Sequence, residues 1–238
     1  MPLVARAAPV RRKTLWLVDL DNTLHDASWQ VMGEINRRMT RYVQEALSLP
    51  PDEASSVRQL YWRRYGATLL GLVRHHNVDP HHFLRETHPI EDLEHMLLPE
   101  AGLARRIRLL RGRRWLITNS PRHYATRVMR HLGIHREFER VICIEDMRAM
   151  GRLKPKPSPW LWHHLHRQSG QPRHHLTLVD DSSENLRGAH RAGLRTARLW
   201  ASTTVRQSGW KRGRPPTAVR PHFVRHQVHS LAVLARLP

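Results

Sequence analysis

The chain of 238 residues carries 40 lysines and arginines against 20 aspartates and glutamates, which gives a net charge of +20 and a pI near 11.6. Its single cysteine, Cys143, excludes an internal disulfide and a cysteine-rich metal site. No apolar run approaches the ~18 residues of a membrane span, and residues 1–13 lack the apolar stretch of a signal peptide. We therefore expect a cytoplasmic protein with no membrane partner, large enough to bury a core.

The first structured element is predicted at residues 15–24, Leu-Trp-Leu-Val-Asp-Leu-Asp-Asn-Thr-Leu. Its apolar start has no helical period and is typical of a strand buried on both faces of a parallel sheet. Asp19 and Asp21 follow at the carboxyl end of this strand, where ligands of open α/β sheets bind. Because ionised carboxylates are costly to desolvate unless they are paired or bound to metal, the two residues indicate a site.

Residues 25–99 read as a block of helices. Apolar residues recur at helical spacing from Val31 to Leu47, Pro50-Pro51 ends that stretch, and further helical segments follow up to Leu98. The histidines in this block lack the spacing of a known metal site. We interpret the block as a helical cap domain inserted after the first strand.

From residue 100 onward, strands and helices alternate regularly. Strands are predicted at 114–120, 140–144, 176–181 and 195–199, with helices between them. This alternation is typical of a parallel sheet with helices on both faces, an α/β fold. We assign 13–24 and 100–201 to this core. Residues 202–238 contain no acid, and we predict a basic, flexible C-terminal tail with a short helix at 230–237, dispensable for chemistry.

Four strand ends of the predicted sheet carry polar side chains that should meet in one crevice. Three or four carboxylates at one point need a cation, and Mg²⁺ prefers oxygen ligands. A lysine and a threonine hydroxyl beside that ion suit a phosphate group. One aspartate can attack phosphorus, and a second can protonate the leaving oxygen and then activate water. The residues in question are Asp19 and Asp21, Thr118 and Asn119, Lys154 or Lys156, and Asp180 and Asp181.

Four motifs in order resemble those of the haloacid dehalogenase superfamily: Asp-Leu-Asp-Asn-Thr-Leu at 19–24, Ile-Thr-Asn at 117–119, Lys-Pro at 156, and Val-Asp-Asp-Ser-Ser-Glu-Asn at 179–185. The resemblance implies a Rossmann-like three-layer α/β/α core with a helical cap. It also implies a phosphatase with Asp19 as nucleophile and Asp21 as general acid and base, because the dehalogenase branch lacks the second aspartate. Thr118 would bind phosphoryl oxygens and Lys156 would neutralise charge. Mg²⁺ would be held by Asp19, the Asp21 carbonyl, Asp181 and Asp180.

Within this superfamily, the first motif together with Tyr65-Gly66-x-x-Leu69-x-Gly71-Leu72 is similar to the pyrimidine 5'-nucleotidase group. That similarity implies a pyrimidine nucleoside 5'-monophosphate as substrate, bound near Asn119, His25 and Tyr65. Tyr61 and Trp62 could stack on a base as well, although helical spacing also fits the cap core. The group usually has an aromatic residue where this chain has His25. Lys154-Pro155 fits the third motif as well as Lys156-Pro157; we prefer Lys156 because Trp162 follows it at the family's spacing.

Two other functions compete with a nucleotidase. The enzyme could act on another small phosphate ester, such as a sugar or glycolate phosphate, because the cap sets the substrate. Alternatively, the +20 charge and the acid-free tail could belong to a nucleic-acid-binding protein with a secondary phosphatase site. The basic residues are spread along the whole chain with no recognised nucleic-acid motif. We therefore favour an arginine-rich solvated surface and a small-molecule substrate; the sequence does not give the oligomeric state.

Overall fold

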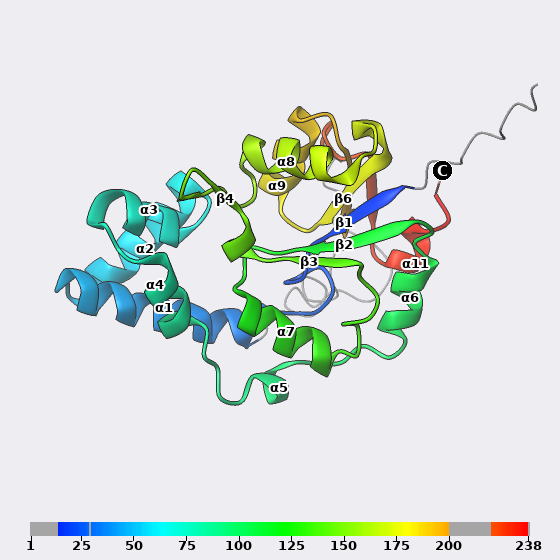
Figure 1. The fold of residues 1–238 in the computed structure, drawn as a ribbon. Coiled ribbons are helices and arrows are strands. Elements are labelled where there is room, and N and C mark those ends of the chain that lie inside the picture. The colour runs from blue at the N-terminus through cyan, green and yellow to red at the C-terminus, as the bar shows by residue number, and fades with distance from the viewer. Residues whose placement is uncertain (1–13, 29, 200–219, 238) are drawn as a thin grey trace, which may run out of the picture.

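The computed structural model describes residues 14–28, 30–199 and 220–237. Its main sheet has six parallel strands in the order β3-β2-β1-β6-β7-β8 (Figure 1). The strands are β1 (Leu15–Val18), β2 (Arg113–Ile117), β3 (Arg140–Ile142), β6 (Leu176–Asp180), β7 (Arg195–Leu199) and β8 (His226–Val228). The predicted α/β fold with a parallel sheet is confirmed. The first strand of the chain lies in the middle, between β2 and β6.

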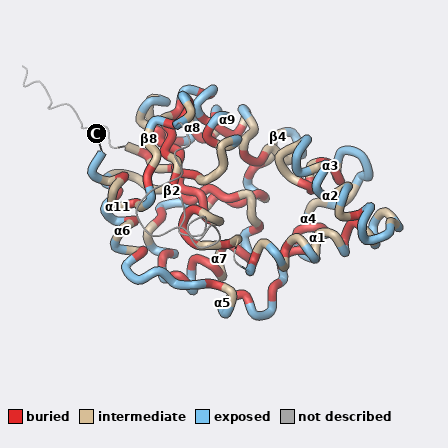
Figure 2. Tube along the Cα trace, turned by 180° about the vertical axis from the view of Figure 1, so that it is seen from behind, coloured by how far each residue is buried: buried red, intermediate tan, exposed pale blue. Residues whose placement is uncertain are grey.

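Helices cover both faces of the sheet. The side chains of β1 alternate, so that Leu15 and Leu17 enter one apolar cluster and Val18 enters another. One face is covered by α8 (Pro159–Ser169) and α9 (Ser183–Arg191). The other is covered by α6 (Leu103–Leu109), α7 (Arg122–His131) and α11 (Leu231–Leu234). This arrangement is the predicted three-layer α/β/α core, and Figure 2 shows its buried strands at the centre.

Four helices follow β1 and pack on one another beside the core (Figure 1). They are α1 (Val31–Leu47), α2 (Pro51–Tyr65), α3 (Thr68–His76) and α4 (Pro80–Thr87). Local signals set their limits: proline stands at the first position of α2 and α4, and Asp79 caps α4 by accepting hydrogen bonds from the N–H groups of His81 and His82. Their shared apolar cluster includes Tyr42, Leu72 and Phe83. These helices form the cap.

The contact between cap and core involves short elements after β3. Ile144, in a 3₁₀ turn (Ile144–Asp146), belongs to the cap cluster, and Leu153 packs against it. Leu153 ends a small antiparallel hairpin of β4 (Arg148–Ala149) and β5 (Arg152–Leu153). By contrast, α5 (Leu93–Met96) packs with the core cluster, although it falls inside the predicted cap range of 25–99. The boundary between the two domains stays a prediction.

The end of the chain differs from the predicted flexible tail. β8 pairs with β7 in parallel and adds a sixth strand to the sheet. Thr196 of β7 fixes this segment because its hydroxyl donates to the carbonyl of Phe223 over 2.5 Å and its own carbonyl accepts from Arg225 N–H over 3.1 Å. The expectation of a flexible tail was therefore wrong for residues 220–237, whereas the short helix predicted at 230–237 is present as α11 (Leu231–Leu234). Residues 202–219 lie outside the described residues. Burial of apolar side chains holds this segment on the core despite its basic composition. The buried residues are Phe223, Val224, Val228, Leu231 and Leu234.

Within the described ranges, no helix has the length and apolar character needed to cross a membrane.

Candidate active site

Two carboxylates stand side by side where the central strands end. β1 and β6 pair in register, with Val18 opposite Val179, so Asp19 and Asp180 come next at the same edge of the sheet. The Asp19 N–H donates to the Val179 carbonyl over 2.9 Å, which continues the ladder to the site. Both side chains are buried, at 9% and 0% exposure. Parallel pairing therefore joins residues that are far apart in the sequence.

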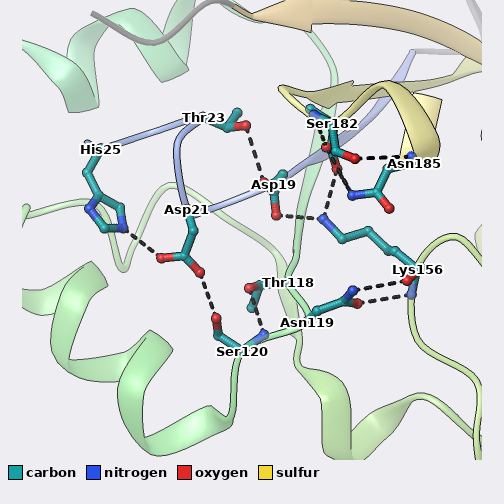
Figure 3. Close-up of polar contacts among 11 residues, drawn as sticks. Asp19, Asp21, Thr23, His25, Thr118, Asn119, Ser120, Lys156, Ser182 and Asn185 are labelled. Carbon is teal, nitrogen blue, oxygen red and sulfur yellow. Dashed lines mark hydrogen bonds and ion pairs between the residues drawn. The ribbon is translucent and has the colours of Figure 1, made fainter. Parts of the chain in front are cut away.

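A buried lysine bridges these two carboxylates (Figure 3). Lys156 Nζ donates to Asp19 Oδ1 over 2.6 Å and to Asp180 Oδ2 over 2.8 Å. Its side chain is 2% exposed. Burial by itself would lower the pKa of this amine, but the two carboxylates outweigh that effect and raise the pKa. Of the two lysines that the sequence left open, Lys156 is thus the one in this site, charged at neutral pH.

The backbone at Lys156 is held by Asn119. The Asn119 side chain donates to the Lys156 carbonyl and accepts from the Lys156 N–H, each over 3.0 Å. On the other side, Trp162 Nε1 donates to the Pro157 carbonyl over 3.2 Å. Both polar atoms of the Asn119 amide are therefore engaged with the lysine loop, and its predicted contact with a substrate stays a prediction.

Asp180 is held by its own loop. Its Oδ1 accepts from the Ser182 N–H over 2.9 Å, and Asn185 Nδ2 lies 3.1 Å from both of its carboxylate oxygens. Asn185 stands in the first turn of α9, for which Ser182 is the N-cap. The strand, its cap and the first helical turn thus fix the Asp180 carboxylate in place.

The carboxylate of Asp21 points to a different set of partners (Figure 3). It accepts hydrogen bonds from His25 Nε2 over 2.9 Å, Ser120 Oγ over 2.6 Å and Tyr124 Oη over 2.7 Å. Burial acts to raise the pKa of Asp21, but these donors outweigh it and lower the pKa. The His25 side chain is only 1% exposed. The structure therefore makes His25 a partner of the half-buried Asp21 carboxylate, and the predicted contact of His25 with a substrate stays a prediction.

Negative charge exceeds positive charge at the centre of the site. One ligand oxygen from each of Asp19, Asp180 and Asp181 lies within 4.8 Å of the others, and Lys156 is their cationic partner. Burial and the neighbouring carboxylates raise the pKa of Asp19 against the lowering effect of Lys156, and burial and Asp180 raise the pKa of Asp181 to about 6. An all-oxygen cluster with excess negative charge fits a hard divalent cation such as Mg²⁺. The Asp21 side chain is not a member of this cluster.

The remaining predicted site residues lie at different depths. Thr118 follows β2, is 1% exposed and accepts the Ser120 N–H at its hydroxyl over 3.0 Å. Tyr65 ends α2 in the cap, where its hydroxyl lies 2.5 Å from His75 Nε2. The next residue, Gly66, lies against the lysine loop, since a methyl group there would be 3.4 Å from Pro157 Cδ. Contact between Tyr65 and a substrate stays a prediction.

Sequence reasoning missed three residues that position the carboxylates. Ser120, Tyr124 and Asn185 donate to Asp21 or Asp180. Ser120 and Asn185 stand inside or next to the second and fourth motifs, and that proximity was the available signal. Tyr124 gave no such signal, because its helical spacing with Val128 indicates only a core residue.

The parallel sheet, its converging carboxylates and the bridging lysine define a hydrolytic enzyme with an α/β core. The family model of haloacid dehalogenase-like hydrolases matches residues 14–193. The chain belongs to this family.

The chain is also similar to individual proteins. The chain is 25% identical over 199 residues to Phosphate metabolism protein 8 of Saccharomyces cerevisiae, an alignment that covers 78% of this chain and 61% of the yeast protein. Two crystal structures share the fold. An HAD phosphatase from Thermococcus onnurineus has a TM-score of 0.58 at 16% identity, over 93% of this chain and 95% of that one. L-2-haloacid dehalogenase from Xanthobacter autotrophicus has a TM-score of 0.53 at 17% identity, over 94% and 97%.

Proposed function

We propose that the protein is a Mg²⁺-dependent phosphomonoesterase that works through an aspartyl-phosphate on Asp19. One observation carries this proposal: Lys156 Nζ joins Asp19 to Asp180 at the end of β1, while a second aspartate, Asp21, stands two residues further on. A nucleophilic carboxylate beside a fixed ammonium group suits an anionic phosphate ester. The name of the yeast relative refers to phosphate metabolism.

In the first step, an Asp19 carboxylate oxygen attacks phosphorus and the bond from phosphorus to the leaving oxygen breaks. The Lys156 ammonium offsets the negative charge that accumulates on nucleophile and phosphoryl group. Thr118 can donate its hydroxyl proton to a phosphoryl oxygen, since its oxygen is already an acceptor for Ser120. Asp21, which is ionised in the free protein because its donors lower its pKa, takes up a proton from water when the anionic ester binds, since the nearby negative charge raises its pKa. It then gives this proton to the leaving oxygen, and the alcohol departs.

In the second step, water cleaves the aspartyl-phosphate. Asp21, now ionised, takes a proton from the water molecule as its oxygen attacks phosphorus. The bond between phosphorus and Asp19 breaks, which releases inorganic phosphate and restores the carboxylate. The hydrogen bonds from Ser120, Tyr124 and His25 hold Asp21 in place for both proton transfers.

Mg²⁺ would be held by Asp19, Asp180 and Asp181, the three carboxylates whose oxygens converge. By family resemblance, the carbonyl of Asp21 would be a further ligand. When bound, the ion would supply positive charge that favours ionised Asp19 and shields the approaching phosphate. The raised pKa of Asp19 is consistent with this need, because burial and the neighbouring carboxylates disfavour the ionised form and Lys156 by itself does not offset them.

For the substrate we propose a pyrimidine nucleoside 5'-monophosphate. The support is the similarity of the first motif and of Tyr65-Gly66 to the pyrimidine 5'-nucleotidase group. In addition, Gly66 lies against Pro157, which brings the end of α2 next to the lysine loop. A sugar phosphate or glycolate phosphate is the alternative, because the core contacts only the phosphate.

The test is a panel of phosphomonoesters assayed for phosphate release with Mg²⁺ and with EDTA. It compares UMP, CMP and dTMP with purine nucleotides, sugar phosphates and p-nitrophenyl phosphate. Asp19→Asn should lose several orders of magnitude in kcat while it keeps its thermal unfolding midpoint within a few degrees. Asp92→Asn, which alters an exposed carboxylate, is the matched control and should retain activity. Near-normal turnover by folded Asp19→Asn would overturn the mechanism; preference for sugar phosphates would overturn only the nucleotide assignment.

A further inference from the structure

The cap carries a surface that the proposed chemistry does not use. We call it the aromatic-arginine surface; it lies on the second half of α2 and the end of α3 (Figure 1). Trp62 is 60% exposed, which is unusual for a large apolar side chain. Its members are Tyr61, Trp62, Arg63, Arg64, Tyr65, Arg74, His75 and His76, of which the two tyrosines are half-buried and the others exposed.

Positive charge on this surface is not offset locally. From residue 58 to residue 78 the chain has four arginines and two histidines and contains no aspartate or glutamate. No ion pair within the described ranges involves Arg63, Arg64 or Arg74, whereas arginines elsewhere pair with Glu34, Glu94 and Glu137. Unpaired guanidinium groups gathered on one surface attract a polyanion.

Two of these arginines are already positioned. The guanidinium carbons of Arg64 and Arg74 lie 5.7 and 5.8 Å from the centre of the Tyr65 ring. Such cation–π contacts hold the charged groups without using their N–H donors. In the part of the chain that the structure describes, neither guanidinium donates a hydrogen bond, so both retain their full donor capacity for phosphate oxygens.

The aromatic rings differ in their availability. Tyr61 lies across the α3 backbone, since a methyl group at Gly71 would be 2.2 Å from Tyr61 Cγ, and its ring stacks on His75 with centroids 5.5 Å apart. The tyrosine hydroxyls are engaged as well, Tyr61 with His76 over 2.7 Å and Tyr65 with His75 over 2.5 Å. These contacts fix the tyrosines as a platform, while Trp62, which lies between them in the sequence of α2, keeps an exposed ring.

We propose that the aromatic-arginine surface binds single-stranded nucleic acid, with phosphates on Arg64 and Arg74 and an unpaired base stacked on Trp62. Single-strand binders combine these two features, a positive track for the backbone and aromatic side chains for the bases. A duplex offers phosphates but keeps its bases stacked on each other, and an acidic peptide offers no comparable ring. The exposed Trp62 therefore selects the single strand among polyanions. This binding is separate from the proposed hydrolysis and does not depend on it.

The test measures binding of the full chain to fluorescein-labelled 12-residue oligouridylate and oligothymidylate by anisotropy across a series of salt concentrations. The variants are Trp62→Ala and the pair Arg64→Ser with Arg74→Ser. Leu60→Ala is the control for Trp62, because Leu60 is a neighbouring apolar side chain that is 47% exposed. Arg130→Ser with Arg136→Ser is the control for charge, since both arginines are exposed on another part of the molecule. Thermal unfolding checks that every variant folds.

We expect Trp62→Ala to weaken binding about tenfold, within the range measured for base stacking. The arginine pair should reduce the slope of log affinity against log salt by about 1.4, since each single-strand phosphate contact contributes about 0.7. Leu60→Ala should bind like the wild type, and Arg130→Ser with Arg136→Ser should show only the small loss of affinity that follows from a lower net charge. Three results would overturn the proposal: no binding by the wild type at low salt, losses no larger than those of the controls, or equal binding of a duplex or polyglutamate with no effect of Trp62→Ala.

Discussion

The hydroxyl of Tyr124 donates a hydrogen bond to Asp21 Oδ1 over 2.7 Å, although the two residues are 103 positions apart. Tyr124 stands in the first turn of α7 and Asp21 follows β1, so the contact exists only because α7 packs on the sheet. Together with Ser120 and His25 it stabilises a half-buried carboxylate. The contact links the packing of the core directly to the residue proposed as general acid and base.

Replacing this hydroxyl tests the link. Tyr124→Phe should lower the free energy of unfolding at pH 7 by about 1–3 kcal/mol, because it removes a hydrogen bond to a charged acceptor. The pKa of Asp21 is lowered in the folded protein, so its contribution is present above the unfolded value near 3.9 and is lost as pH falls through the folded value. The deficit of the variant should therefore shrink towards pH 3 in urea unfolding curves. In an Asp21→Asn background the deficit should also shrink; an unchanged deficit there would contradict the assignment.

Addition of Mg²⁺ should stabilise the protein through the convergent carboxylates. We expect millimolar Mg²⁺ to raise the thermal unfolding midpoint of the wild type, because an ion that binds only the folded state shifts the equilibrium. Asp181→Asn should remove most of that rise, since it deletes one of the three ligand oxygens. Differential scanning fluorimetry with Mg²⁺ and with EDTA measures both effects. An equal rise in wild type and variant would place the ion elsewhere.

Without metal, lowering the pH should increase the stability of the folded protein through Asp181, whereas an aspartate with a lowered pKa would decrease it. Burial and Asp180 raise the pKa of Asp181 to about 6 in the folded state, above its unfolded value near 3.9. The folded state then binds more protons between these values, so stability should rise as pH falls from 7 to 5. In EDTA, Asp181→Asn should lose the part of this rise that belongs to Asp181, which we expect to be on the order of 1–3 kcal/mol; Asp19, whose pKa is also raised, keeps its own contribution. Parallel pH profiles of the two proteins in urea unfolding would disprove it.

Two helical glycines of the cap should respond oppositely to alanine. In α3, Gly71→Ala places a methyl group 2.2 Å from Tyr61 Cγ and should cost about 1–3 kcal/mol or more by overpacking. In α1, Gly33→Ala places it 3.8 Å from Arg37 Nη1, an ordinary contact, and should stabilise by about 0.5–1 kcal/mol. Chemical unfolding of the two variants measures both signs. A further Tyr61→Ala change should relieve the loss at Gly71→Ala; equal effects of both alanines would contradict the packing.

Removal of residues 220–238 should destabilise the protein. The deletion exposes β7 as an edge strand and removes buried side chains such as Phe223, Val228 and Leu231. It also leaves the Thr196 hydroxyl without the Phe223 carbonyl. We expect aggregation or a lower unfolding midpoint, measured by size-exclusion chromatography and thermal unfolding. A truncated chain that is monodisperse with an unchanged midpoint would restore the sequence-based expectation of a dispensable tail.

Local patterns in the sequence were sufficient to predict much of the core fold. The run from Leu15 to Val18 predicted a buried central strand, because only a strand covered on both faces is apolar throughout. The alternation of strands and helices after residue 100 predicted the parallel sheet, because parallel strands need crossover connections, which are usually helices. The prediction for the end of the chain was wrong because a short strand, His226–Val228, has no clear pattern of its own among basic and turn residues. Its stability comes from pairing with β7.

The sequence by itself determined the residue types at the strand ends and, through strand periodicity, that Asp19 and Asp180 would meet at one edge of the sheet. Only the tertiary structure decided which lysine bridges them, because Lys154 and Lys156 have the same local pattern and Asn119 fixes the backbone at Lys156 alone. It also gave Asp21 its donors and placed Trp62 on an exposed surface. Periodicity reports which side of an element a residue occupies. The partner that it contacts there depends on how distant elements pack.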